Sequence, residues 1–178
     1  MELFLREPSL EDKDEIIKMC EELESCDDEI KFEGLSDLKT VLDSSFEDFI
    51  NRIEGNKHIE DSKPQYVNQT TYVLADETGH IYGGVNIRHK LNDALMNHGG
   101  HIGYLIRPSE RRKGYSLIQL KEALDIAKKV FNIDKVFISC REKNIGSKKT
   151  IEKTGGYSAG DNYIDTDGTV FLRYWINN

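Results

Sequence analysis

The 178-residue sequence has few cysteines and no long apolar run. Its three cysteines, Cys20, Cys26 and Cys140, are irregularly spaced, which excludes a disulfide framework and indicates free thiols in a reducing compartment, expected to be the cytoplasm. The N-terminus lacks the basic segment and apolar core of a signal peptide, and no apolar run is long enough to span a bilayer. A membrane partner is therefore not expected.

Cations are scarcer than anions. The 32 acidic and 24 basic residues give a formal net charge of −8. Nucleic acids and anionic membranes bind broad basic surfaces, so this balance argues against both as main partners. It is compatible with a cationic partner, although an acidic surface more often serves solubility alone.

The chain also lacks internal repeats, low-complexity tracts and Pro/Gly/Ser linkers, which predicts a single domain over residues 1–178. Hydrophobic periodicity predicts strands at 3–7, 70–76, 81–89, 101–106 and 135–141, a last hairpin over 157–176, and helices after Ser9 and over 38–53, 113–131 and 144–156. The hairpins predict antiparallel pairing, and the strand–helix–strand unit over 101–141 predicts a parallel crossover. The expected fold class is α+β, with a mixed, mostly antiparallel central sheet and helices on both faces.

The stretch RPSERRKGYS, residues 107–116, stands where a predicted strand gives way to a predicted helix. Its cations, Arg107, Arg111, Arg112 and Lys113, oppose the helix dipole and cost stability unless an anion offsets them. Backbone N–H groups at a helix start have no intrahelical acceptor, and Gly114 allows a close approach to the backbone. The pattern therefore predicts an anion site suited to phosphate, although neither the Walker nor the Rossmann glycine motif is present.

Residues 101–157 resemble the GNAT superfamily of acyl-CoA-dependent N-acetyltransferases. Residues 111–116, RRKGYS, match its pyrophosphate-binding signature [QR]-x-x-G-x-[GA] except that Ser116 replaces Gly or Ala. Residues 144–157, NIGSKKTIEKTGGY, resemble its second landmark, N-x-x-A-x-x-x-Y-E-K-x-G-F, with Ile151 in place of the usual Tyr. The resemblance implies a GNAT fold with two splayed central parallel strands, acetyl-CoA as co-substrate and no metal.

The resemblance also implies the cofactor-binding residues. The backbone of Tyr104, Leu105 and Ile106 would pair with the pantetheine arm, and Asn144 and Ser147 would line its channel. The pyrophosphate would be held by the stretch Arg111, Arg112, Lys113, Gly114, Tyr115 and Ser116. The implied reaction is direct transfer of an acetyl group from acetyl-CoA to a primary amine of a small molecule or peptide in a ternary complex. In many family members the Tyr that Ile151 replaces protonates the departing thiolate, so the sequence identifies no acid for this step.

The amine must lose a proton before it attacks, and the first candidate for the base is His101, at the start of the strand that would carry the acetyl group. The alternative is a strand-end histidine without a catalytic role. A metal site built from His89, His98 and His101 is disfavoured because no thiolate and no tight spacing accompanies them. Cys140, on a buried strand, is expected to be a core residue and not a nucleophile.

Three further expectations stay open. The acidic loop of Asp27, Asp28, Glu29 and Glu33 would either attract an ammonium group or form a solvated face. The chain would be an enzyme or, alternatively, a catalytically degenerate acyl-CoA-binding or sensing protein of the same fold. An open edge on the terminal hairpin would permit a homodimer.

Overall fold

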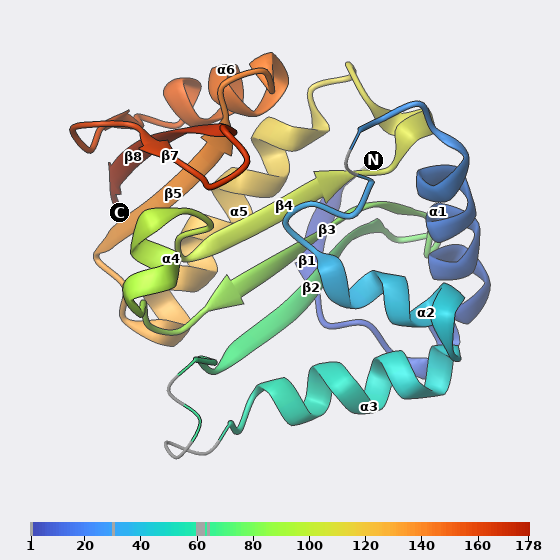
Figure 1. The fold of residues 1–178 in the computed structure, drawn as a ribbon. Helices are drawn as coiled ribbons and strands as arrows, with labels where there is room; N and C mark the ends of the chain where they lie inside the picture. Colours follow the sequence, from blue (N-terminus) through green and yellow to red (C-terminus); the bar gives the residue numbers. More distant parts are fainter. Residues whose placement is uncertain (1, 30, 60–62, 64) are drawn as a thin grey trace.

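The computed structural model describes residues 2–29, 31–59, 63 and 65–178 (Figure 1). The described strands are β1 (Leu3–Arg6), β2 (Gln69–Asp76), β3 (Ile81–Arg88), β4 (Ile102–Ile106), β5 (Lys135–Arg141), β6 (Tyr157–Ser158), β7 (Tyr163–Ile164) and β8 (Val170–Asn177). The described α-helices are α1 (Lys13–Ser25), α2 (Lys39–Asp43), α3 (Phe46–Asn56), α4 (Asp93–Asn97), α5 (Tyr115–Phe131) and α6 (Ile145–Lys153). Residues 60–62 and 64, between α3 and β2, lie outside the described residues.

The strands form two four-stranded sheets in the described part of the chain. The first has the order β1-β2-β3-β4 with antiparallel pairs throughout, so the predicted hairpin over residues 70–89 is confirmed. In the second, β8 pairs with β5 on one side and with the short β6 and β7 on the other. The α+β class with mostly antiparallel sheets is therefore confirmed.

The two sheets meet where β4 and β5 lie side by side, with their arrows pointing the same general way (Figure 1). Among the described residues, one isolated bridge between Gly100 and Ile138 joins them, and the His101 N–H donates to the Phe137 carbonyl at 2.7 Å. Beyond that point β4 and β5 are not paired. The predicted splay of two central strands is confirmed, and it leaves backbone groups of both strands free for a ligand.

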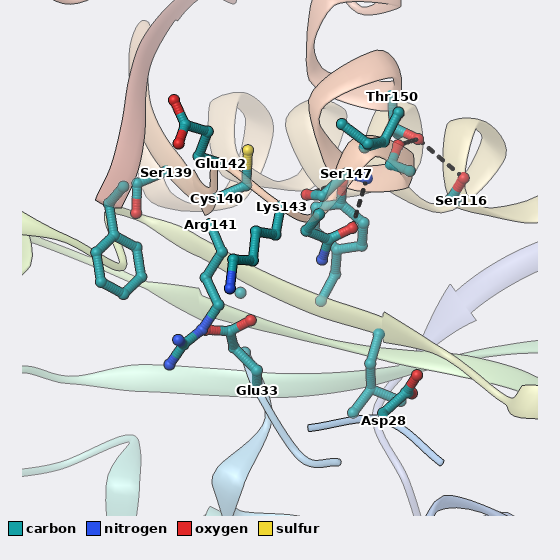
Figure 2. A pocket seen from close by; sticks show the side chains of 18 of the residues that line it. Asp28, Glu33, Ser116, Ser139, Cys140, Arg141, Glu142, Lys143, Ser147 and Thr150 are labelled. Atoms are coloured by element: carbon teal, nitrogen blue, oxygen red, sulfur yellow. Dashed lines mark hydrogen bonds and ion pairs between the residues drawn. The ribbon is translucent and has the colours of Figure 1, made fainter. Parts of the chain in front are cut away.

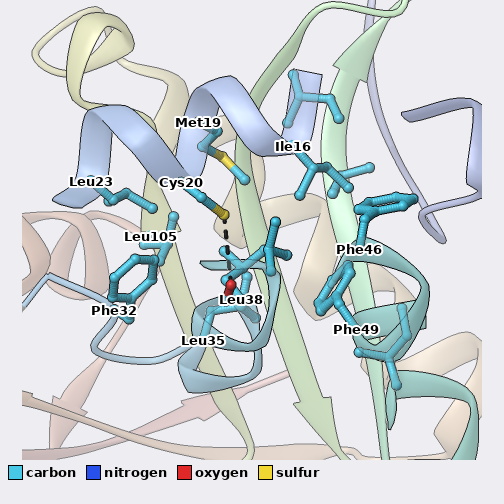
Figure 3. Close-up of a cluster of buried hydrophobic side chains, with 14 of the residues drawn as sticks. Ile16, Met19, Cys20, Leu23, Phe32, Leu35, Leu38, Phe46, Phe49 and Leu105 are labelled. Carbon is cyan, nitrogen blue, oxygen red and sulfur yellow. Dashed lines mark hydrogen bonds between the residues drawn. The ribbon is translucent and has the colours of Figure 1, made fainter. Parts of the chain in front are cut away.

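Helices cover both faces of the sheets, as predicted. Alternate residues of β2 point to opposite sides, so Val73 and Ala75 enter one core cluster and Tyr72 the other. The first cluster packs α1, α2 and α3 against β2 and β3 (Figure 3). The second packs α5 and α6 against the splayed strands, with Leu120 and Ile151 fully buried. None of the described helices combines the length and the apolar character that a bilayer crossing needs.

The prediction of one helix over 38–53 is wrong. The structure ends α2 at Asp43 and begins α3 at Phe46, after Ser45, whose hydroxyl accepts a hydrogen bond from the Asp48 N–H at 3.0 Å. Serine competes for backbone hydrogen bonds and favours helix caps over helix interiors. The apolar periodicity runs through the break because both helices pack into the same core cluster.

The predicted last hairpin turns between Asp165 and Thr169, where the Gly168 N–H donates to the Asp165 carbonyl and the Asp165 N–H to the Thr169 carbonyl, both at 2.9 Å. Its first strand, however, is interrupted into β6 and β7, each two residues long. Since β8 is flanked on both sides, the open edge consists of these two short strands. Homodimer formation through this edge stays a prediction.

Candidate active site

A cleft of about 1200 Å³ opens where β4 and β5 separate (Figure 2). It follows β4 from Ile102 to Ile106 and is walled by residues 28–29 and 31–34, the stretch 111–116, the end of β5 with the start of α6, and the β7–β8 turn. Of the residues predicted to bind the cofactor, all except Lys113 line this cleft: Tyr104, Leu105, Ile106, Arg111, Arg112, Gly114, Tyr115, Ser116, Asn144 and Ser147.

One end of the cleft, which we call the phosphate end, is formed by residues 111–116 at the start of α5. Gly114 has a left-handed backbone (φ 89°), as does Arg112 (φ 61°), and this curls the chain into the helix. Among the described residues, the backbone N–H groups from Arg112 to Ser116 have no hydrogen-bond acceptor. The first turn of α5 also contains no acidic residue. The arrangement presents several free donors and a positive helix end to the cleft.

Arg107 does not belong to the phosphate end, contrary to the sequence-based expectation. Its side chain is buried, with Nε 2.6 Å from a Glu22 carboxylate oxygen and Nη1 2.9 Å from one of Glu15. These contacts tie the end of β4 to α1. Burial alone would lower the pKa of Arg107, but the two carboxylates outweigh it and raise that pKa above its ordinary value.

Two of the remaining cations also have partners, so the expectation of an unneutralised cluster is largely wrong. Arg111 forms an ion pair with Asp28 at 2.6 Å, and Lys113 forms one with Glu110 at 3.0 Å. In the part of the chain that the structure describes, Arg112 has no carboxylate partner. The free backbone N–H groups therefore indicate an anion site more strongly than the charges do.

Hydroxyl groups from three elements form two pairs along the cleft, one in its middle and one beside the phosphate end. The Tyr104 hydroxyl of β4 lies 2.9 Å from the Ser147 hydroxyl of α6, and the Ser116 hydroxyl of α5 lies 3.0 Å from that of Thr150 (Figure 2 labels the serines and Thr150). Burial raises the pKa of Tyr104 to about 12, so this hydroxyl keeps its proton at neutral pH. Ile151, at the position of the family's usual Tyr, is fully buried in the core.

Asn144 has a structural contact as well as its predicted place in the cleft. Its side-chain oxygen accepts a hydrogen bond from the Ser147 N–H at 3.0 Å and caps α6. The acceptor atom is thus occupied, and the amide NH₂ is the part of Asn144 that a cofactor would meet.

Cys140 lines the cleft but has the properties of a core thiol. It is buried, and burial raises its pKa to about 11. A thiolate is the nucleophilic form of cysteine, so this thiol is unsuited to covalent catalysis at neutral pH. The other two cysteines are also free thiols.

At the opposite end, which we call the acceptor end, side chains converge from separate segments. Glu33 pairs with Arg141 across the cleft at 2.6 Å (Figure 2). The Glu33 loop is held against β4 by a close approach, since a Cβ on Gly103 would lie 2.3 Å from the Gly34 carbonyl oxygen. Arg88, the last residue of β3, also lines the cleft here. Neither arginine could be found from the sequence, because no local pattern connects positions 33, 88 and 141.

His101 does not line the cleft. Its Nδ1 accepts a hydrogen bond from the Phe137 N–H at 2.9 Å, so the ring helps to join the two sheets. Burial lowers the pKa of His101 to about 4, which makes it a weak base at neutral pH. The position gives no support to its predicted role as the base. Of the three histidines considered together, His98 is the one at the cleft, stacked on Phe171 at 4.7 Å.

The splayed strands beside a helix start with free backbone N–H groups fit the fold that the resemblance implies, and the comparisons with known proteins agree. A family model for the GNAT acetyltransferase domain matches residues 2–156. The chain belongs to this family. In the described residues no group of three or more His, Cys, Asp or Glu side chains forms a candidate metal site.

Known relatives are distant. The chain is similar to the uncharacterized N-acetyltransferase YjdG of Bacillus subtilis strain 168, at 26% identity over 104 residues, 58% of this chain and 56% of the relative. It thus spans just over half the length of that curated relative. The spermidine N-acetyltransferase of Vibrio cholerae matches with TM-score 0.63 as a dodecamer in an intermediate state, at 18% identity and 98% and 93% coverage of the two chains. Its complex with CoA and spermine matches with TM-score 0.60, at 18% identity and 98% and 95% coverage. These structures establish the fold alone.

Proposed function

We propose that this chain is an N-acetyltransferase that transfers an acetyl group from acetyl-CoA to a primary amine of a small molecule or peptide, by direct attack in a ternary complex. The observation that carries the proposal is the row of free N–H groups from Arg112 to Ser116, opening onto a cleft between splayed strands. Helix starts of this kind bind phosphate through backbone donors. The pyrophosphate would bind there, and the unpaired edge of β4 from Tyr104 to Ile106 would receive the pantetheine amides.

In the proposed reaction the neutral amine attacks the thioester carbonyl, a C–N bond forms, and the C–S bond breaks. The amine gives up a proton to water or a base, and the departing sulfur needs one, because a thiol has a pKa of about 8.5. Ile151 carries no hydroxyl for this purpose. The Tyr104 hydroxyl lines the middle of the cleft and keeps its proton, so we assign it the role of acid toward the sulfur.

The relatives support an amine acceptor and acetyl-CoA as the donor. YjdG and the Vibrio cholerae enzyme are both named as N-acetyltransferases, and one structure of the latter contains CoA and spermine. The second candidate function is a non-catalytic acyl-CoA sensor. Ile151 at the usual Tyr position favours it, since the family's acid is missing there.

The proposal is tested by the thermal unfolding midpoint with and without acetyl-CoA, in the parent and in two variants. Gly114→Asp places a carboxylate where the pyrophosphate would bind. Gly155→Asp is the matched control, because both glycines have φ 89° and no atom lies within 4 Å of an added Cβ in either place. Ligand at 100 times its dissociation constant stabilises a protein by about 2.7 kcal/mol. We expect this shift in the parent and in Gly155→Asp, and its loss in Gly114→Asp.

The absence of a shift in the parent would overturn acetyl-CoA binding at this site. If the shift is present, release of free CoA thiol with a panel of amines separates the two functions. Thiol release that depends on an amine identifies the transferase, whereas binding without release for every amine identifies the sensor.

A further inference from the structure

Arg88 differs from the other arginines that line the cleft. Its side chain is half-buried, and Nη1 donates to the Gly100 carbonyl at 3.0 Å. No carboxylate of the described residues lies within ion-pair distance of its guanidinium. By contrast, Arg111 and Arg141 each have a carboxylate partner, and Arg112 is exposed to solvent. Arg88 is therefore the half-buried guanidinium of this cleft that lacks a counter-ion in the described part of the chain.

Arg88 lies at the acceptor end of the cleft. Its backbone N–H donates to the His101 carbonyl at 2.7 Å, which places it beside the start of β4. The phosphate end follows the other terminus of the same strand, and the span from Ile102 to Ile106 is about 13 Å at the usual rise per strand residue. A cofactor anchored at residues 112–116 and laid along β4 would thus present its acyl group toward Arg88.

A guanidinium taken out of water without an anion is costly, and it forms its strongest contacts with carboxylates in paired hydrogen bonds. Burial lowers the pKa of Arg88, in keeping with an incompletely compensated charge. The charge that opposes this effect is that of Asp37, whose carboxylate is already bound by Arg52 at 2.6 Å and Asn56 at 2.9 Å. Nε and Nη2 of Arg88 have no hydrogen-bond acceptor among the described residues, so these donors can meet a ligand.

We propose that Arg88 binds a carboxylate of the acceptor, so that the acceptor is an amine of the amino-acid class. This inference rests on the proposed transferase function and specifies its substrate. A polyamine would place a further positive charge beside Arg88, which is unfavourable at short range. The turn carboxylates Asp165 and Asp167 line the same cleft and have no cationic ion-pair partner among the described residues. These two carboxylates could attract the amine of an amino acid or of a polyamine, so Arg88 is the residue that distinguishes these two classes of acceptor.

The test compares amines that differ only in the carboxylate. Suitable pairs are tyrosine with tyramine, methionine with 3-methylthiopropylamine and lysine with cadaverine, with spermidine as an added polyamine. Thiol release from acetyl-CoA gives kcat and KM for each. For at least one pair we expect kcat/KM of the parent to be at least about 10-fold higher for the carboxylated member, since one charged hydrogen-bonded contact contributes a factor of this order.

Arg88→Gln is the main variant, because the amide retains a donor for the Gly100 carbonyl but removes the charge. We expect it to abolish the preference by raising KM for the amino acid about 10- to 100-fold, with the decarboxylated amine changed less than about 2-fold. Arg88→Lys keeps the charge without the planar fork. Its preference for the carboxylated amine should therefore lie between that of the parent and that of Arg88→Gln. Arg173→Gln is the matched control, since Arg173 also donates to backbone carbonyls, of Asp161 and Met96, but does not line the cleft.

The outcomes separate the two proposals. If acetyl-CoA fails to raise the unfolding midpoint of the parent, the transferase proposal fails and the acceptor proposal with it. If acetyl-CoA binds but no carboxylated amine of the panel reacts, the proposal that Arg88 binds the carboxylate of the acceptor is overturned. The same holds if spermidine and the decarboxylated amines react better than the carboxylated ones. An equal loss for both members of a pair in Arg88→Gln overturns it too. The midpoint with acetyl-CoA, measured for each variant, shows that the fold and the cofactor site are intact.

Discussion

At the phosphate end of the cleft the groups proposed to bind a ligand come from one continuous stretch, residues 111–116, and they are mainly backbone N–H groups. At the acceptor end they are side chains from Glu33, β3, β5 and the β7–β8 turn. A backbone site depends on local conformation and tolerates side-chain changes. A side-chain site changes its specificity with single substitutions while the fold is retained. The two matched Vibrio cholerae structures, each 18% identical to this chain, share the fold with TM-scores of 0.63 and 0.60, so the fold is retained while most side chains differ.

The largest expected effect is the loss of unfolding free energy in Arg107→Met. This substitution removes the ion pairs that hold the end of β4, next to the phosphate end, against α1. Removing one partner of a buried ion pair costs about 3–5 kcal/mol, and because Glu15 and Glu22 are partly exposed we expect about 2–3 kcal/mol. Urea unfolding at neutral pH measures this change. Arg52→Met is the control, since Asp37 keeps hydrogen bonds from Asn56 and Gln69, and it should cost less than about 1 kcal/mol.

The difference in unfolding free energy between the parent and Arg107→Met should depend on pH. Burial pushes the pKa of Glu15 and of Glu22 upward, but hydrogen bonds from Arg107 and, respectively, Lys18 and Ser109 outweigh it and hold both below the ordinary value of 4.5. Their contribution to the free energy of unfolding is thus complete above pH 4.5 and is lost as the pH falls through the lower pKa values of the folded state. The difference between parent and Arg107→Met should shrink in acid. A difference that stays constant down to the acid transition contradicts this account.

The contrast between the two ends also explains what the sequence could predict. The turn at 107–116 and the start of α6 after Asn144 are local, so the residue types in these stretches predicted a helix start with an anion site and the helix over 144–156. The partners of the cations were not predictable, because Asp28 is 83 positions before Arg111 in the chain and reaches it only through the packing of α1. The contacts at the acceptor end also join residues that are far apart in the sequence. Glu33 and Arg141 are 108 positions apart, and the burial of Arg88 depends on how β3 meets β4.

Tyr104 lies between the two ends, and Tyr104→Phe tests whether the chemistry depends on it. A general acid contributes about 10²–10⁴-fold, and a thiolate departs readily, so we expect kcat to fall only about 10- to 100-fold. KM for acetyl-CoA should be unchanged, because the backbone of β4 is kept. Tyr115→Phe is the control, since Tyr115 also lines the cleft but packs its ring against Tyr82 at 4.7 Å. An equal fall in both variants, or none in Tyr104→Phe, excludes the assignment.

The smallest effects come from the two ion pairs that cross the cleft, one near each end. Asp28 pairs with Arg111 at the phosphate end, and Glu33 pairs with Arg141 at the acceptor end. Asp28→Asn releases Arg111 for the pyrophosphate. Because an exposed ion pair is worth no more than about 1 kcal/mol, the affinity for acetyl-CoA should rise by about 2- to 5-fold, and less at high salt.

Glu33→Gln is the counterpart of this variant, since it also removes one negative charge from the same loop. If the two ends act separately, it should leave the dissociation constant of acetyl-CoA unchanged and alter KM of the amine instead, because Arg141 and the Glu33 loop border the acceptor end. Isothermal titration with acetyl-CoA and amine kinetics on both variants provide the comparison. Equal effects of both variants on acetyl-CoA binding would mean that the loop acts as one electrostatic unit over the whole cleft. If Asp28→Asn changes only the dissociation constant of acetyl-CoA and Glu33→Gln changes only KM of the amine, each ion pair affects the binding of one ligand independently of the other. The separate positions of the two pairs in the cleft predict this result.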